Sequence, residues 1–89
     1  MRELDITNQY KKDLRRAVRQ GRDTDKLDEM IFLLLNDECI PEKNKDHDLK
    51  GGRIGFRELH LEPDWLLIYE KPDELRLTLT RLGSHSELF

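Results

Sequence analysis

The sequence predicts an α+β fold in which a small antiparallel sheet carries an N-terminal α-hairpin on one face, in the order β-α-α-β-β-β. Three observations predict it. Apolar residues recur at helical spacing along two stretches of the first half. A strand–turn–strand pattern follows over residues 57–69. From residue 75, leucines alternate with polar residues. The 89 residues suit one domain, spanning 1–89.

The first half predicts a short strand and two helices. Alternation over residues 3–6 suits a strand, and Thr7 or Asn8 then caps a helix that ends at Gly21. A second helix is expected to begin near Asp23 or Thr24 and to stop before Pro41. The two apolar stripes that pack the hairpin on the sheet consist of Tyr10, Leu14, Ala17 and Val18, and of Leu27, Met30, Ile31, Leu34 and Leu35.

The second half predicts three strands. Residues 41–53 are polar and loop-like, with Gly51-Gly52 as a turn. Strands are expected at 54–62 and 65–70, joined by a turn at Glu62-Pro63-Asp64, because proline and aspartate favour turns. A further turn at 71–74 leads to a half-buried strand from Leu75, and residues 86–89 form a tail.

Charge is unevenly distributed along the chain. The formal net charge of −3 does not favour nucleic-acid binding, yet residues 10–21 hold five cations against one carboxylate, whereas residues 22–48 hold four basic and nine acidic residues. Lys11, Lys12, Arg15 and Arg16 lie on one face of the predicted first helix. That face is either an ordinary solvated surface or a contact for a phosphate-rich partner.

The cellular setting follows from what the sequence lacks. No apolar run reaches the roughly 18 residues that a membrane span needs, and the N-terminus has no signal-peptide segment. The single Cys39 cannot form an internal disulfide. We therefore expect a cytoplasmic protein without a membrane partner.

The polar residues expected at the strand ends suit RNA cleavage, and we expect no cofactor. Histidine can take a proton from the ribose 2′-hydroxyl or give one to the 5′-oxygen, and a guanidinium can neutralise the phosphorane. An aromatic ring can stack on an exposed base. The residues of this set are His47, His60, Asp64, Arg81 and His85, with Trp65 and Phe89 beside them.

A purely structural role and a metal site are the two alternatives to this interpretation. A lone histidine on a strand is usually a satisfied polar residue, and a tryptophan that opens an apolar strand is usually core. Three histidines and Asp64 could also bind zinc, although the spacing from His60 to Asp64 matches no tight metal motif.

Three segments carry a resemblance to a known family. They read DHDLKG at 46–51, FRELHLEPDWLLIY at 56–69 and RLGSHSELF at 81–89. With them, nearly the whole chain resembles the YafQ branch of the RelE/ParE superfamily, the toxins of bacterial type II toxin–antitoxin pairs. The resemblance implies a RelE-like fold and a ribosome-dependent endoribonuclease that cuts mRNA in the ribosomal A site without metal.

The resemblance also implies roles and partners. His85 would be the general acid, His60 and Asp64 would orient or deprotonate the 2′-hydroxyl, and His47 would assist. Arg81 would hold the phosphate, while Trp65 and Phe89 would shape the nucleotide pocket. The implied partners are the 70S ribosome with its mRNA and a cognate antitoxin, which occupies the active site and joins the toxin in a complex on operator DNA.

The net negative charge departs from the usual basic character of such toxins. That departure concerns contact with the ribosome and not the chemistry. Apart from it, two other functions stay open. One is a non-catalytic ParE-like binding toxin, which has no need of three histidines. The other is an inactive regulator that works only in its antitoxin complex.

Overall fold

The computed structural model describes residues 1–49 and 55–89 of the chain. The predicted Gly51-Gly52 turn and the start of the strand expected at 54–62 lie outside them. The predicted α+β fold with its α-hairpin is confirmed. The elements are β1 (Glu3–Ile6), α1 (Asn8–Arg19), α2 (Thr24–Leu35), the 3-10 helix η1 (Glu42–Asn44), β2 (His47–Asp48), β3 (Phe56–Glu62), β4 (Trp65–Glu70), β5 (Arg76–Gly83) and α3 (His85–Leu88).

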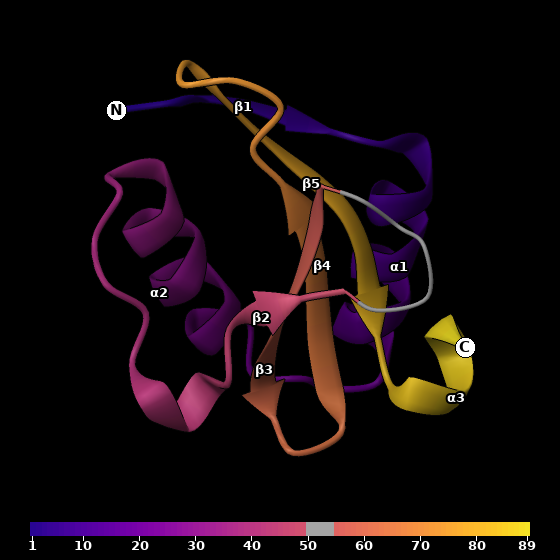
Figure 1. The fold of residues 1–89 in the computed structure, drawn as a ribbon. Coiled ribbons are helices and arrows are strands. Elements are labelled where there is room, and N and C mark those ends of the chain that lie inside the picture. Colours follow the sequence, from indigo (N-terminus) through magenta and orange to yellow (C-terminus); the bar gives the residue numbers. More distant parts are fainter. Residues whose placement is uncertain (50–54) are drawn as a thin grey trace.

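Five strands form one mixed sheet in the order β1-β5-β4-β3-β2 (Figure 1). Strands β3 to β5 pair in antiparallel fashion, as expected, and β2 adds an antiparallel pairing with β3. Strand β1 instead pairs parallel to β5, with Ile6 opposite Leu79. The sequence pattern identified β1 as a strand and could not give its direction, because alternation is the same in both kinds of pairing. The two-residue strand β2 and the final helix α3 replace a predicted loop and tail.

The two helices cover one face of the sheet (Figure 1). The core on that side joins Tyr10 and Ala17 of α1 and Leu27, Met30 and Leu34 of α2 to inward residues of β3, β4 and β5. A second, smaller cluster of Leu66, Ile68 and Leu88 lies apart from this core. Two predicted apolar positions are solvent-facing instead: Val18 is 59% exposed and Leu75, just before β5, is 72% exposed.

Local sequence sets the helix ends. Thr7 caps α1 by accepting from the amide of Tyr10, and Asp23 caps α2 by accepting from the amide of Asp25. Gly21, between them, has φ +75°, a conformation that glycine adopts without strain. No helix within residues 1–49 and 55–89 is long and apolar enough to cross a membrane.

Helix α1 also completes the edge of β5 where β1 ends. The hydroxyl of Thr7 donates to the Thr80 carbonyl, at 2.8 Å, and the Leu82 amide donates to Asp13 Oδ2, at 3.0 Å. The Asp13 side chain has no solvent exposure and also accepts from Arg81 Nε at 2.8 Å. Because an unpaired buried carboxylate is very costly, these donors make Asp13 the polar anchor between α1 and the sheet.

We expect Asp13→Ala to destabilise the fold by about 3 kcal/mol, because it leaves the Leu82 amide and the Arg81 guanidinium without their acceptor. The exposed Asp28→Asn on α2 is the matched control, with a change under about 0.5 kcal/mol. Urea unfolding at pH 7 measures both. Equal midpoints for the two variants would contradict the anchoring role.

The same anchor should make stability depend on acid. Although burial alone would raise the pKa of Asp13, hydrogen bonds from Arg81, Leu82 and Gln9 hold it below its ordinary value. A lowered folded-state pKa gives stability that is present above the unfolded pKa of about 4 and is lost as pH falls through the folded value. Asp13→Asn should therefore lose less stability than the wild type between pH 5 and acid unfolding.

Candidate active site

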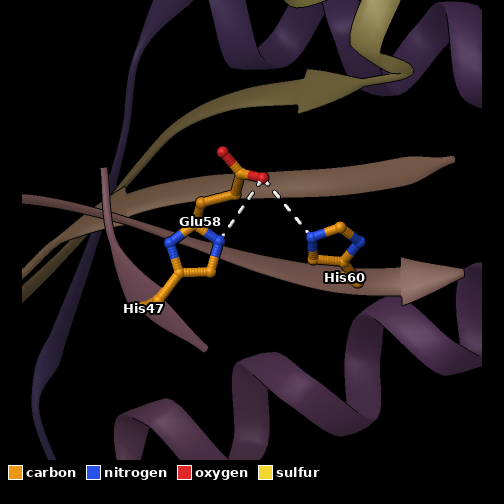
Figure 2. A group of neighbouring side chains, drawn as sticks. All are labelled: His47, Glu58 and His60. Atoms are coloured by element: carbon orange, nitrogen blue, oxygen red, sulfur yellow. Dashed lines mark ion pairs between the residues drawn. The ribbon is translucent and has the colours of Figure 1, made fainter. Parts of the chain in front are cut away.

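A buried carboxylate lies between two histidines (Figure 2). Glu58 Oε1 is 3.8 Å from His47 Nε2 and 3.5 Å from His60 Nε2. The register of β2 on β3 places His47 opposite Glu58, and Glu58 and His60 share one face of β3 because strand side chains alternate. The Glu58 side chain is only 8% exposed, whereas that of His47 is 45% exposed, so the carboxylate lies beneath the imidazoles.

The third histidine is paired with Asp64 of the β3–β4 turn. Asp64 Oδ1 is 2.9 Å from the His85 amide and 2.6 Å from His85 Nδ1. The amide of His85, followed by its side chain, lowers the pKa of Asp64, so this carboxylate is ionised at neutral pH. An ionised carboxylate only accepts hydrogen bonds, which assigns the proton to Nδ1 and leaves Nε2 to act on a substrate.

The two groups join into one row. The ring centroids of His47 and His60 are 6.2 Å apart, and those of His60 and His85 are 5.8 Å apart. The structure therefore brings together the three histidines and Asp64 that the sequence predicted at one end of the sheet. It adds Glu58, which sequence reasoning missed, although its place two residues before His60 on a strand signals a shared face.

Ion pairs of the two residues that flank His47 hold strand β2 against β3. Arg57 Nη1 is 2.7 Å from Asp48 Oδ1, and Arg57 Nη2 is 3.3 Å from Asp46 Oδ2. The hydroxyl of Tyr69 on β4 also donates to Asp46. The two carboxylates that flank His47 in sequence thus pair with Arg57 and staple the short strand to its neighbour.

Arg81 lies in line with this row but is already engaged. The pairing of β5 with β4 sets Arg81 opposite Ile68, which in turn lies opposite Glu58 on β3. The Arg81 side chain is 28% exposed and ion-pairs with Asp13, so its guanidinium is fixed rather than mobile.

The two predicted aromatic residues differ. Trp65 is only 1% exposed and belongs to the helix-side core, with the Arg22 guanidinium 5.4 Å from its ring centroid. This burial does not suit stacking on a base and corrects the expected pocket role: the ring anchors the start of β4 beside Asp64. Phe89 is 62% exposed and has a ring face available.

The four residues of the predicted basic face of α1 differ in whether their charge is paired. Lys11, Lys12 and Arg15 are exposed and make no ion pair within residues 1–49 and 55–89. Arg16 instead donates to the Leu82 carbonyl at 3.2 Å and pairs with Glu87 at 3.0 Å. Only three of the four predicted contact residues therefore present unpaired charge.

A pocket of about 550 Å³ opens beside His60, between α2, η1 and the end of β3. Its lining includes the apolar Met30 and Leu61 and the cationic Lys43 and Lys45. The side-chain amide of Asn44 donates to the His60 carbonyl at 2.7 Å, which ties η1 to the strand that carries the central histidine. His60 thus belongs both to the lining of the pocket and to the histidine row.

Comparison with known proteins identifies the family and agrees with this fold. Residues 2–89 match a family model described as the bacterial toxin of type II toxin–antitoxin system, YafQ. The mRNA interferase toxin YafQ of Escherichia coli K12 is 40% identical over 89 residues, which cover 99% of this chain and 96% of that protein.

Two solved structures are similar throughout. The toxin in the E. coli DinJ–YafQ toxin–antitoxin complex has a TM-score of 0.92 at 40% identity, covering 99% of this chain and 97% of that one. A copper-bound mutant toxin from Helicobacter pylori has a TM-score of 0.94 at 40% identity, covering all of both chains.

Fold, site and matches together define a toxin of a bacterial type II toxin–antitoxin system. Within that class, the chain belongs to the YafQ family. The predicted family and RelE-like fold are thereby confirmed. The predicted enzyme class is confirmed as well, since the curated relative is named an mRNA interferase, that is, an endoribonuclease.

Proposed function

We propose that this toxin is a ribosome-dependent endoribonuclease that cleaves mRNA in the A site by attack of the ribose 2′-hydroxyl on the adjacent phosphate. The observation that carries the proposal is the row of three histidines, each within hydrogen-bonding or ion-pairing reach of Glu58 or Asp64. Such pairs can take and give protons near neutral pH, which this reaction requires at two oxygens.

The geometry favours a division of roles. His85, whose side chain is 53% exposed and whose Nδ1 is held by Asp64, is the general acid for the 5′-oxygen. His60 and the buried Glu58 form the pair best suited to take the 2′-hydroxyl proton, and the more exposed His47 assists.

Substrate contacts follow from charge and space. Arg81, fixed by Asp13, supplies a positioned guanidinium for the phosphorane. Phe89 offers an exposed ring for a base, and the pocket beside His60 is of a size that holds small-molecule ligands. Lys11, Lys12 and Arg15 contact ribosomal RNA.

The partners follow from the same assignment. The similar E. coli toxin is found in a complex with its antitoxin, so we infer a cognate antitoxin that covers the histidine row and forms a complex with this toxin on operator DNA. The toxin then acts on the ribosome and its mRNA in the cytoplasm.

A second candidate function is reversible metal binding. His47, Glu58 and His60 each offer one ligand atom, and these three atoms lie within 4.8 Å of one another. Two imidazoles and a carboxylate suit a divalent transition metal, and a similar toxin binds copper. The sequence had suggested Asp64 as the carboxylate of such a set, and the structure supplies Glu58 in its place. A metal here would occupy the nitrogen atoms that cleavage needs, and would inhibit.

We expect His85→Ala to lower mRNA cleavage in a cell-free translation reaction by roughly 100-fold to 10,000-fold, because a general acid contributes about that much. Thermal unfolding of the two proteins controls for folding, since His85 is exposed. Translation arrest without cleavage, equal in both proteins, would favour a ParE-like binding toxin. Absence of both effects would favour an inactive regulator.

Reversal of Lys11, Lys12 and Arg15 to glutamate should weaken ribosome association and flatten its dependence on salt, because each lost phosphate contact removes about 0.7–0.9 from the slope of log K against log salt. A control variant neutralises Lys26, Lys71 and Arg76, cations that pair with acids of the chain. Sedimentation with ribosomes measures both variants. If the reversed variant and the control show equal slopes, α1 does not contact the ribosome.

Copper should bind the isolated toxin and inhibit cleavage, and a chelator should restore it. His47→Ala and Glu58→Gln should each weaken copper binding by about 10-fold or more, since each removes one ligand. Calorimetric titration measures the affinity, with the exposed Asp28→Asn on α2 as control. Unchanged affinity in both ligand variants would place the copper elsewhere.

A further inference from the structure

Helix α3 carries His85 but has little structure of its own. It spans the four residues His85–Leu88, with Phe89 as its C-cap residue. Its cap is built by Ser84 and Glu87: the Ser84 amide donates to Glu87 Oε1 at 2.8 Å, and the Glu87 amide donates back to the Ser84 hydroxyl at 3.3 Å. Isolated helices of this length are not stable in water, so external contacts must set where His85 lies.

Helix α1 supplies such contacts through Glu87. Arg16 Nε lies 3.0 Å from Glu87 Oε2, and the Gln20 side chain donates to the same oxygen at 3.0 Å. The amide of Ser84 and the side chain of Gln20 lower the pKa of Glu87, with a smaller contribution from the charge of Arg16, so the carboxylate stays ionised at neutral pH. One carboxylate thus caps α3 with one oxygen and holds α1 with the other.

Arg16 bridges three parts of the fold at once. Its Nη2 donates to the Leu82 carbonyl at 3.2 Å and to Asp13 Oδ1 at 3.3 Å, while its Nε pairs with Glu87. The guanidinium and Glu87 close over the backbone of Gly83: a Cβ there would lie 2.9 Å from Arg16 Nη2 and 3.1 Å from Glu87 Oε1. The glycine therefore allows the pair to lie against the chain directly before the α3 cap.

We propose that Arg16 and Glu87 form a positioning pair that fixes α3, and with it His85, against Asp64 for the cleavage reaction. This inference rests on the proposed function. It also assigns Arg16 a role different from that of its neighbours on α1: Arg16 acts inside the toxin through Glu87, whereas Arg15, one residue away and exposed, is left to contact RNA.

A double-mutant cycle tests the pair. Arg16→Gln and Glu87→Ala should each lower kcat for cleavage on the ribosome by about 10-fold with little change in KM, because a small misplacement of a catalytic group affects the chemical step. In the double variant, kcat should also fall by about 10-fold rather than 100-fold, since both changes break the same Arg16–Glu87 ion pair. Glu87→Gln, which keeps the cap acceptor but not the charge, should fall between Glu87→Ala and wild type.

A second measurement does not depend on activity. The His85 amide donates to Asp64 Oδ1, so its hydrogen exchange reports the docking of α3 on the turn. Exchange at His85 should accelerate in Arg16→Gln and Glu87→Ala and stay unchanged in Arg15→Gln, the matched control. The amide of Leu67, in the centre of the sheet, should exchange equally slowly in all of them and so verifies folding.

The outcomes separate the alternatives. If Arg16→Gln raises KM at constant kcat, as Arg15→Gln should, and Glu87→Ala has no effect, Arg16 is a docking cation and the positioning pair is refuted. If the single losses multiply in the double variant, the two residues act separately, which also refutes it. If the wild type does not cleave mRNA at all, the proposed function fails, and the exchange at His85 still decides whether the pair positions α3.

Discussion

The structure depends on one buried carboxylate. Strand β1 is too short to cover the whole edge of β5, and α1 completes that edge with side chains instead of a strand. Asp13 is central to this arrangement because it accepts from the Leu82 amide and from Arg81 without exposure to water. One interaction therefore fixes the hairpin to the sheet and fixes the arginine that is in line with the histidine row.

The layers of the fold explain where chemistry is possible. Because α1 and α2 bury one face of the sheet, polar residues of β3 such as Glu58 and His60 point to the opposite face. A carboxylate accompanies the histidines at each end of the row, Glu58 at one and Asp64 at the other. Acidic residues also form ion pairs with Arg16, Arg57 and Arg81, so the net charge of −3 is a poor guide to the surface that meets a partner.

Sequence reasoning placed the three histidines and Asp64 together but did not identify the residues that hold them. Three histidines and Asp64 could be predicted because turns and strand ends are local features, and those bring the residues to one end of the sheet. Glu58 was missed because its importance depends on β2 pairing across from it. Trp65 and Arg16 were assigned to substrate contact because residue type alone does not distinguish an exposed ring or cation from one packed against the core or paired with Glu87.

The sequence by itself determined the α+β class, the two amphipathic helices and the β3–β4 hairpin, and it placed the histidines at one end of the sheet. Periodicity, caps and turn residues act over a few positions, so these features can be predicted locally. Only the tertiary structure decided that β1 runs parallel to β5, that α3 carries His85, and that Asp13, Glu58 and Glu87 are the partners of the site. These contacts join residues up to about 70 positions apart, and their geometry exists only once the sheet and its helices have packed.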